Sequence, residues 1–165
     1  MSAFAPLTII GLIRSPFHEP AGTPVQPVFA GETQGTVEIF PQYVEGLRDL
    51  EGFERVWLLY WLDRAPAPRL EVVPFRDDVE RGLFATRAPC RPNPIGLSCV
   101  RLLGVEGNRL AIGGVDILDG TPLLDVKPYV PQFDAFPQSR AGWIENCPNG
   151  RTHADDRFAS DGSQG

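Results

Sequence analysis

The chain has 165 residues, of which 42% are hydrophobic, and this fits one globular domain with a sizeable core. Its formal net charge of -6 argues against a protein whose whole surface binds a nucleic-acid backbone, because that affinity comes mainly from lysine and arginine. A local basic groove remains compatible with this charge. Glycine and proline contribute 17 residues each, without any repeat, which favours many short strands joined by turns.

The cysteines are odd in number and far apart: Cys90, Cys99 and Cys147. With only two histidines in the chain, this spacing indicates neither a disulfide framework nor a zinc site, so we expect reduced thiols and no metal. The N-terminus lacks the pattern of a signal peptide, and the longest apolar run, residues 56–62, is far too short to span a membrane. We expect a cytoplasmic protein without a membrane segment.

Apolar and β-branched runs bounded by proline, glycine or charged residues predict the strands. They lie at residues 7–13, 36–40, 56–62, 97–103, 110–118 and 122–128, with a short additional strand at 84–86. The run at 56–62 is continuously apolar, which is typical of a strand covered on both faces. It is the expected centre of the core.

Loops and a short helix connect these strands. The proline-rich loop after the first strand carries the apolar tip Pro27, Val28 and Phe29, which is expected to cover another surface. Apolar residues at helical spacing after Pro41 predict a short helix that Gly52 closes. Hydrophobicity falls from residue 143 onward, so residues 154–165 are predicted to form a frayed tail.

Residues 84–98 carry a positive charge although the chain is negative overall, because they contain Arg87 and Arg91 and no acidic side chain. Each proline in this loop restricts the residue before it, so Arg91 and Asn93 are expected to be extended and the loop stiff. Two arginines beside an ordered asparagine suit a carboxylate, a phosphate or an acidic neighbour. A solvated surface turn is the plainer interpretation of the same pattern.

A second polar group follows the strand predicted at 110–118. Asp119 precedes Gly120, a standard turn signal, so its carboxylate has a structural interpretation as well as a functional one. Asp116 interrupts an apolar run, where a carboxylate must face water or be paired. Asp125, Lys127 and Tyr129 alternate beyond the turn and form either the exposed side of a strand or the rim of a pocket.

Four motifs stand in one order along the chain: Arg14-Ser15-Pro16-Phe17, residues 84–87 with 91–96, residues 115–122, and residues 125–129. In sequence and spacing they resemble the TsaA-like family, also called YaeB-like or TrmO-like, from about Thr8 to about Trp143. Its characterised members are S-adenosylmethionine-dependent tRNA methyltransferases. Family members commonly have a histidine and a polar neighbour after the central strand, where this chain has Leu62-Asp63-Arg64.

The resemblance implies a mainly β, small single-domain barrel with short helices and long Pro/Gly-rich loops, unrelated to the Rossmann fold. This domain would span residues 1–145, with residues 146–165 as a flexible C-terminal extension. It also implies a homodimer with cofactor sites near the subunit interface. The implied reaction is methylation of N6 in the threonylcarbamoyl-modified adenosine next to the anticodon of tRNA. Several bacterial members continue into a second domain, whereas this sequence stops at Gly165.

Site residues follow from the same resemblance and from the chemistry of S-adenosylmethionine, which carries a carboxylate, an ammonium, a sulfonium and an adenine. The implied cofactor contacts are Pro27, Val28, Phe29, Leu62, Asp63, Arg87, Leu97, Val115, Asp116, Ile117, Leu118 and Asp119. The implied substrate contacts are Arg91, Asn93, Lys127 and Tyr129. No catalytic side chain is assigned, because methyl transfer needs positioning rather than a protein nucleophile.

Two other functions remain open at this point. One is a module that binds S-adenosylmethionine or a nucleotide and regulates a partner without catalysis. The other is a methyltransferase that acts on a small molecule or a protein.

Overall fold

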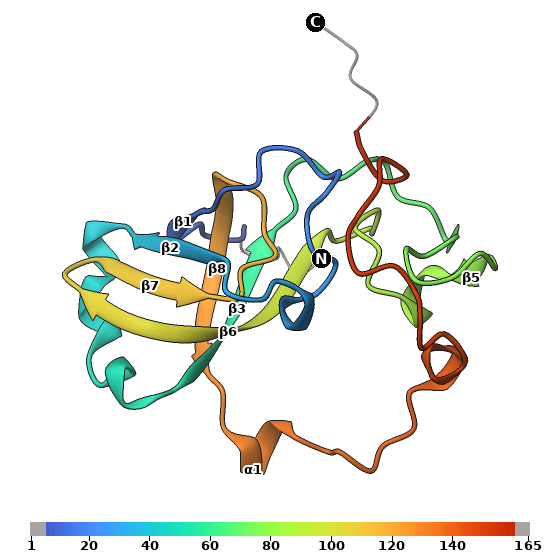
Figure 1. Cartoon of the computed structure of the whole chain (residues 1–165). Coiled ribbons are helices and arrows are strands. Elements are labelled where there is room, and N and C mark those ends of the chain that lie inside the picture. Colours follow the sequence, from blue (N-terminus) through green and yellow to red (C-terminus); the bar gives the residue numbers. More distant parts are fainter. Residues whose placement is uncertain (1–5, 161–165) are drawn as a thin grey trace, which may run out of the picture.

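The computed structural model describes residues 6–160, and its larger part is a closed antiparallel β-barrel (Figure 1). In their order around the barrel, the strands are β1 (Gly11–Arg14), β2 (Gln34–Ile39), β7 (Arg109–Gly113), β6 (Ile95–Glu106), β3 (Arg55–Trp61) and β8 (Thr121–Pro128). Pairing of β8 with β1, with Gly11 opposite Leu123, closes the barrel. The mainly β, non-Rossmann barrel expected from the sequence is confirmed.

The barrel core follows from the alternation of side chains along each strand. In β3, Val56, Leu58 and Tyr60 are at most 6% exposed, whereas the residues between them are half-buried. Complete burial on both faces, predicted for residues 56–62, is therefore wrong, because a barrel wall has only one inner face. The other strands supply to this core Ile13, Val37, Ile39, Val100, Leu110, Ile112 and Leu123.

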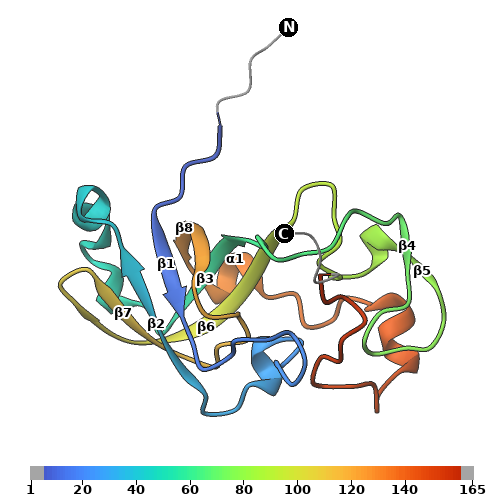
Figure 2. The ribbon, with the colours of Figure 1, turned by 90° about the horizontal axis from the view of Figure 1, so that it is seen from above.

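A smaller body, which we call the second lobe, lies beside the barrel and consists of residues 63–91 and 143–160 (Figures 1 and 2). Its only sheet within the described part of the chain is the pair β4 (Glu71–Val72) and β5 (Arg81–Gly82). Its own small core consists of Val72, Leu83, Ala88, Cys90 and Phe158. A fully exposed arm, which begins with α1 (Pro131–Asp134), leads from β8 to this lobe (Figure 1).

The last described residues pack against the long loop that follows β1. The Gly22 amide donates to the Ala154 carbonyl at 2.8 Å, and the Ala154 amide donates to the Thr23 carbonyl at 2.7 Å. Phe158 is only 4% exposed. A frayed tail from residue 154 is therefore wrong as far as residue 160, and residues 161–165 lie outside the described residues. The division into residues 1–145 and 146–165 stays a prediction.

Short 3₁₀ helices replace two predicted elements. They span Pro27–Phe29, Pro41–Leu47, Leu50–Gly52, Leu83–Ala85 and Gly142–Asn146. The strand predicted at 84–86 is wrong, because the Thr86 amide donates back to the Leu83 carbonyl and closes a helical turn. The helix predicted after Pro41 is two 3₁₀ turns instead, separated near Asp49, whose φ of 67° interrupts helical geometry.

Two strands are shorter than predicted. β7 ends at Gly113 because Gly114 has a φ of 76°, which leaves the extended region. β1 begins only at Gly11, and Leu7 is 62% exposed. Among residues 6–160, no helix has the length and apolarity that crossing a bilayer would require.

Candidate functional site

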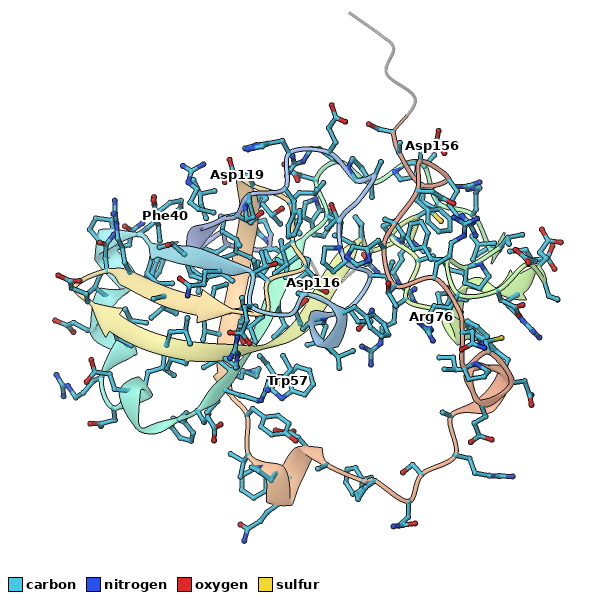
Figure 3. The ribbon with its side chains drawn as sticks, viewed as in Figure 1. Phe40, Trp57, Arg76, Asp116, Asp119 and Asp156 are labelled. Carbon is cyan, nitrogen blue, oxygen red and sulfur yellow. The ribbon has the colours of Figure 1, made fainter. Side chains whose placement is uncertain are left out.

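A cleft of about 340 Å³, here called the first cleft, opens between the barrel and the second lobe. Asp116 marks its position between the two bodies (Figure 3). Among the residues that line it are Leu62, Asp63, Arg87, Arg91, Leu97, Asp116, Ile117 and Leu118, all of them implied as site residues by the sequence. The fold thus gathers half of the expected contacts, from four separate segments, around one opening.

A chain of hydrogen bonds that begins inside the barrel holds Asp116. Ser98 Oγ on β6 donates to Asp116 Oδ1 at 2.7 Å, and the Tyr60 hydroxyl on β3 lies 2.9 Å from Ser98 Oγ. Because Ser98 has a single hydroxyl proton, Tyr60 is the donor to Ser98. A side chain at Gly96 would collide with the Tyr60 ring, so glycine is needed at this position.

Burial shifts the pKa values of Asp116 and Tyr60, which both line the first cleft. Loss of hydration raises the pKa of Asp116 to about 7, although the Ser98 hydrogen bond and the Arg87 charge act in the opposite direction. Burial, and next the charge of Asp116, raises the pKa of the Tyr60 hydroxyl. Tyr60 is therefore a neutral donor, while the negative charge on Asp116 depends on pH near neutrality.

Arg87 supplies a positive charge to the first cleft, which Arg64 and Arg91 also line. It is exposed, and its Nη1 donates to Gln26 Oε1 at 2.6 Å. Gln26 belongs to the loop after β1 and also lines the cleft. Because water reaches this bond, an anionic ligand can replace Gln26 as the acceptor at small net cost.

Arg91 lines the same cleft but is engaged by its own loop. Its Nη1 donates to the carbonyl oxygens of Thr86 at 2.9 Å and Ala88 at 3.2 Å. Its guanidinium also lies over the Phe84 ring, 5.7 Å from the centroid. These contacts fix the bend of the loop, so we assign Arg91 a structural role here.

Asp119 lies at the turn before β8 and does not line the first cleft. Its Oδ1 accepts the Ser15 amide at 3.1 Å, and its carbonyl accepts Arg64 Nη2 at 2.8 Å. Gly120 follows with a φ of 78°, which a turn of this kind requires. The structure therefore favours the turn interpretation of Asp119.

The remaining predicted residues lie elsewhere. Val115 is fully buried in the barrel core, and Val28 and Phe29, which follow Pro27, line a separate cleft described below. Asn93 does not line the first cleft, and neither do Lys127 and Tyr129.

Lys127 and Tyr129 belong to the exposed side of β8 and its continuation. Lys127 Nζ lies 3.0 Å from Asp125 Oδ2, and Tyr129 packs edge-on against Trp57 at 5.8 Å between centroids. Trp57 lies on the outside of the barrel (Figure 3). Of the two interpretations of this alternation, the structure favours the exposed side of a strand.

Sequence reasoning missed several residues that line the first cleft. Gln26 and Thr23 come from an irregular loop, and Phe158 comes from the segment predicted to be frayed. Tyr60 looks like an ordinary member of an apolar strand. Its inward alternation in β3 was the available signal, because a tyrosine hydroxyl that enters a barrel core needs a partner.

The first cleft is suited to a ligand with both charges and an apolar ring. Arg87 offers a cation and Asp116 an anion, and apolar side chains such as Leu62 and Leu97 also belong to the lining. Among residues 6–160, no group of three or more His, Cys, Asp or Glu side chains is arranged to hold a metal ion.

Comparison with protein families matches residues 12–135 to the tRNA-methyltransferase O N-terminal domain. A probable S-adenosyl-L-methionine-binding protein of Pyrococcus abyssi is 54% identical over 136 residues, which cover 82% of this chain and 74% of that protein. The tRNA (adenine(37)-N6)-methyltransferase of Escherichia coli is 34% identical, over 84% of this chain and 63% of the enzyme.

Among solved structures, TrmO from Pseudomonas aeruginosa superposes with a TM-score of 0.75 at 43% identity, covering 90% of this chain and 65% of that chain. The chain thus spans less than two thirds of the length of this structure and of the E. coli enzyme.

Proposed function

Because the chain belongs to the tRNA-methyltransferase O N-terminal domain family, we propose that it binds S-adenosyl-L-methionine in the first cleft and methylates an adenine of tRNA at N6. The name of the E. coli relative specifies N6 of adenine 37. The TsaA-like motifs imply the threonylcarbamoyl-modified form of this adenosine as the acceptor. The relative's name and the motifs both support N6-methylation beside the anticodon as the proposed reaction.

The observation that carries the proposal is that Arg87 and Asp116 line one cleft. The amino-acid end of S-adenosylmethionine carries both a carboxylate and an ammonium. Arg87 offers an exposed guanidinium to the first, and Asp116 offers a carboxylate to the second. Leu62, Leu97 and Ile117 provide the apolar wall that an adenine ring requires.

The residues of the cleft bind and orient rather than react. When bound, S-adenosylmethionine supplies an activated methyl group on a sulfonium. Tyr60 and Ser98 keep the Asp116 carboxyl in one orientation through the chain of hydrogen bonds from the barrel core. A rigid arrangement of this kind lowers the entropy lost when ligand and acceptor align for in-line displacement. The acceptor nitrogen is the nucleophile, so no nucleophile of the chain is required.

Isothermal titration with S-adenosylmethionine, with ATP as the control ligand, tests the cofactor assignment. We expect saturable binding of S-adenosylmethionine, about one per chain, and no binding of ATP. Equal binding of both ligands would point to a nucleotide module instead. Absence of heat and of a thermal shift with either ligand would remove the cofactor assignment.

Transfer of radiolabelled methyl groups to tRNA tests the acceptor. The matched substrates are tRNA with and without the threonylcarbamoyl group. We expect label only in the modified tRNA. Label that reaches only unmodified tRNA would show that the acceptor is wrong, and label in neither would remove tRNA methylation from the proposal.

A homodimer belongs to the same proposal, because the TsaA-like motifs imply cofactor sites near a subunit interface. Light scattering at micromolar concentration measures the mass directly. A mass of one chain, 18.1 kDa, would contradict the dimer.

A second candidate function is a binding module without catalysis. It is favoured by the printed name of the P. abyssi relative, which mentions S-adenosyl-L-methionine binding alone. Saturable cofactor binding together with absence of methyl transfer to any tRNA preparation would identify this function.

A further inference from the structure

A second cleft of about 570 Å³ adjoins the first and lies mainly in the second lobe. The two clefts share six residues in their linings: Val25, Gln26, Phe75, Thr86, Arg87 and Phe158. A ligand that extends from the first cleft past Arg87 therefore enters the second. Of the implied cofactor contacts, Val28, Phe29 and Arg87 line this second space, and the contacts proposed in the first cleft leave the rest of it unassigned.

Aromatic rings dominate the lining of the second cleft: Phe29, Phe75, Phe84, Trp143 and Phe158. Each of these rings has an arginine guanidinium 4.9 to 5.7 Å from its centroid. No other aromatic ring in the described part of the chain has such a partner. Cation–π pairs are thus concentrated at one place, on the rings that line this cleft.

These rings are held in place although the cleft is open. Trp143 Nε1 donates to the Ala85 carbonyl at 2.8 Å, which fixes one edge of the indole. Arg76, over the Phe29 ring, donates to the carbonyls of Gly150 and Arg151. Phe84 nevertheless remains 76% exposed. A large aromatic side chain that is exposed yet braced by its neighbours indicates a contact surface.

The charges of the cleft favour an anionic ligand in part. Arg81 is neutralised by Asp77 at 2.6 Å and Arg157 by Asp155 at 2.7 Å. No carboxylate among the described residues lies within 4.0 Å of Arg76 or Arg87, both of which line the cleft. Beside several aromatic rings the cleft therefore offers two cations without a carboxylate partner. Arg76 is held by backbone carbonyls, whereas Arg87, within residues 6–160, is bonded only to the Gln26 side chain. Flat aromatic bases joined by phosphates match that combination.

We propose that the second cleft binds an unpaired RNA nucleobase that neighbours the methyl acceptor. The inference rests on the proposed function, because that function brings the acceptor adenine of a tRNA to the cofactor in the first cleft. Base stacking on exposed aromatic rings requires a single strand, since bases in a duplex are already stacked. The net charge of -6 also fits contact with a few nucleotides rather than with a long phosphate backbone.

The test compares Phe84→Ala with a matched control, Phe133→Ala. Phe84 is 76% exposed in the second cleft, and Phe133 is 71% exposed on α1, away from both clefts. Neither residue belongs to a core, so both variants are expected to fold. The probe is a fluorescein-labelled single-stranded RNA of about eight nucleotides, within the range of known single-strand sites. Fluorescence anisotropy gives its dissociation constant.

We expect Phe84→Ala to weaken binding of this RNA about tenfold or more, since removing one stacking ring costs that much in other single-strand sites. Phe133→Ala is expected to bind as the wild type does. A duplex of the same sequence, and a single strand with abasic sites, are expected to bind at least tenfold more weakly than the intact single strand.

Three results would overturn the proposal. They are equal affinities of the two variants, equal affinities for single strand and duplex, and a change from dimer to monomer in Phe84→Ala alone. The last would show that a second copy of the chain covers the cleft. Failure of the proposed function is distinguishable, because RNA binding that depends on Phe84 without methyl transfer leaves the second cleft assigned and removes only the catalysis.

Discussion

The barrel and the second lobe reach an ordered structure by different means. The barrel uses a closed ladder of backbone hydrogen bonds around a core of aliphatic side chains from six strands. The second lobe has a two-residue strand pair and a small core. Arginine side chains supply much of its remaining order: Arg76, Arg91 and Arg157 all donate to backbone carbonyls.

This difference has a consequence for function. In a sheet, backbone carbonyls accept hydrogen bonds from neighbouring strands, whereas in the second lobe several accept them from arginine side chains. The lobe therefore consists mainly of irregular loops, with exposed aromatic rings at its surface. The first cleft lies between this lobe and the barrel, and the second lies mainly in the lobe. The barrel thus holds Asp116 in place through Ser98, and the loops of the second lobe form the more adaptable side of the first cleft.

The largest expected effect is that of Leu58→Ala in the barrel, compared with Leu83→Ala in the lobe. The two leucines are 0% and 1% exposed, so the same methyl groups are removed from equally buried sites. We expect Leu58→Ala to cost about 4 kcal/mol of unfolding free energy and Leu83→Ala about 2 kcal/mol, because the small core relaxes more easily around a cavity. Urea unfolding measures both.

Amide hydrogen exchange shows which part of the chain each substitution destabilises. Leu83→Ala is expected to speed exchange in residues 71–90 while the barrel amides stay protected. Uniform loss of protection in both variants would show that the two bodies unfold as one unit and would remove the distinction between them.

Next in size is Arg91→Ala, which removes the hydrogen bonds from Arg91 Nη1 to the Thr86 and Ala88 carbonyls. Hydrogen bonds from a charged donor are worth more than neutral ones, so we expect a loss of about 2 kcal/mol. The control is Arg109→Ala on the barrel, where the side chain is 65% exposed and lies 3.8 Å from Glu38. This variant is expected to change stability by less than about 0.5 kcal/mol. Similar losses in both would refute the special role of arginines in the lobe.

Asp116→Asn should have a smaller effect that depends on pH. The folded pKa of Asp116 is raised from 3.8 to about 7, so the folded state binds this proton more tightly than the unfolded state. Wild-type stability is therefore expected to fall as the pH rises from about 4 to about 7. The asparagine variant lacks this decline, so the difference in unfolding free energy between the two proteins should change across this pH range.

Chemical denaturation at several pH values measures this difference. Parallel pH dependences of the wild type and the asparagine variant would show that Asp116 does not titrate in this range. Binding of S-adenosylmethionine offers a second readout, because attraction of its ammonium should strengthen as Asp116 ionises above pH 7.

The smallest expected effect on stability is that of Arg87→Ala, because its side chain is exposed and bonded only to Gln26. The thermal midpoint should stay unchanged, while the affinity for S-adenosylmethionine should fall about tenfold through loss of a charged hydrogen bond. Arg109→Ala again serves as the control and should leave affinity unaltered. Unchanged affinity in Arg87→Ala would remove this residue from the site.

The sequence by itself determined which segments extend and which turn. Apolar runs bounded by proline, glycine or charged residues located β3, β6 and β8 to within a few residues. It also determined that Asp116, placed in an apolar run, had either to face water or to be paired. The motifs then placed the chain in its family and named eight of the residues that line the first cleft.

Only the tertiary structure decided which partner each polar group found. Ser98 and Tyr60 reach Asp116 because β6 and β3 are neighbours in the barrel, and 38 residues separate the two in sequence. Phe158 enters a core because the C-terminal segment pairs with the loop after β1, although its local composition resembles a tail. Local patterns encode the direction of a side chain, whereas contacts between distant segments depend on the closure of the whole barrel and the packing of the lobe against it.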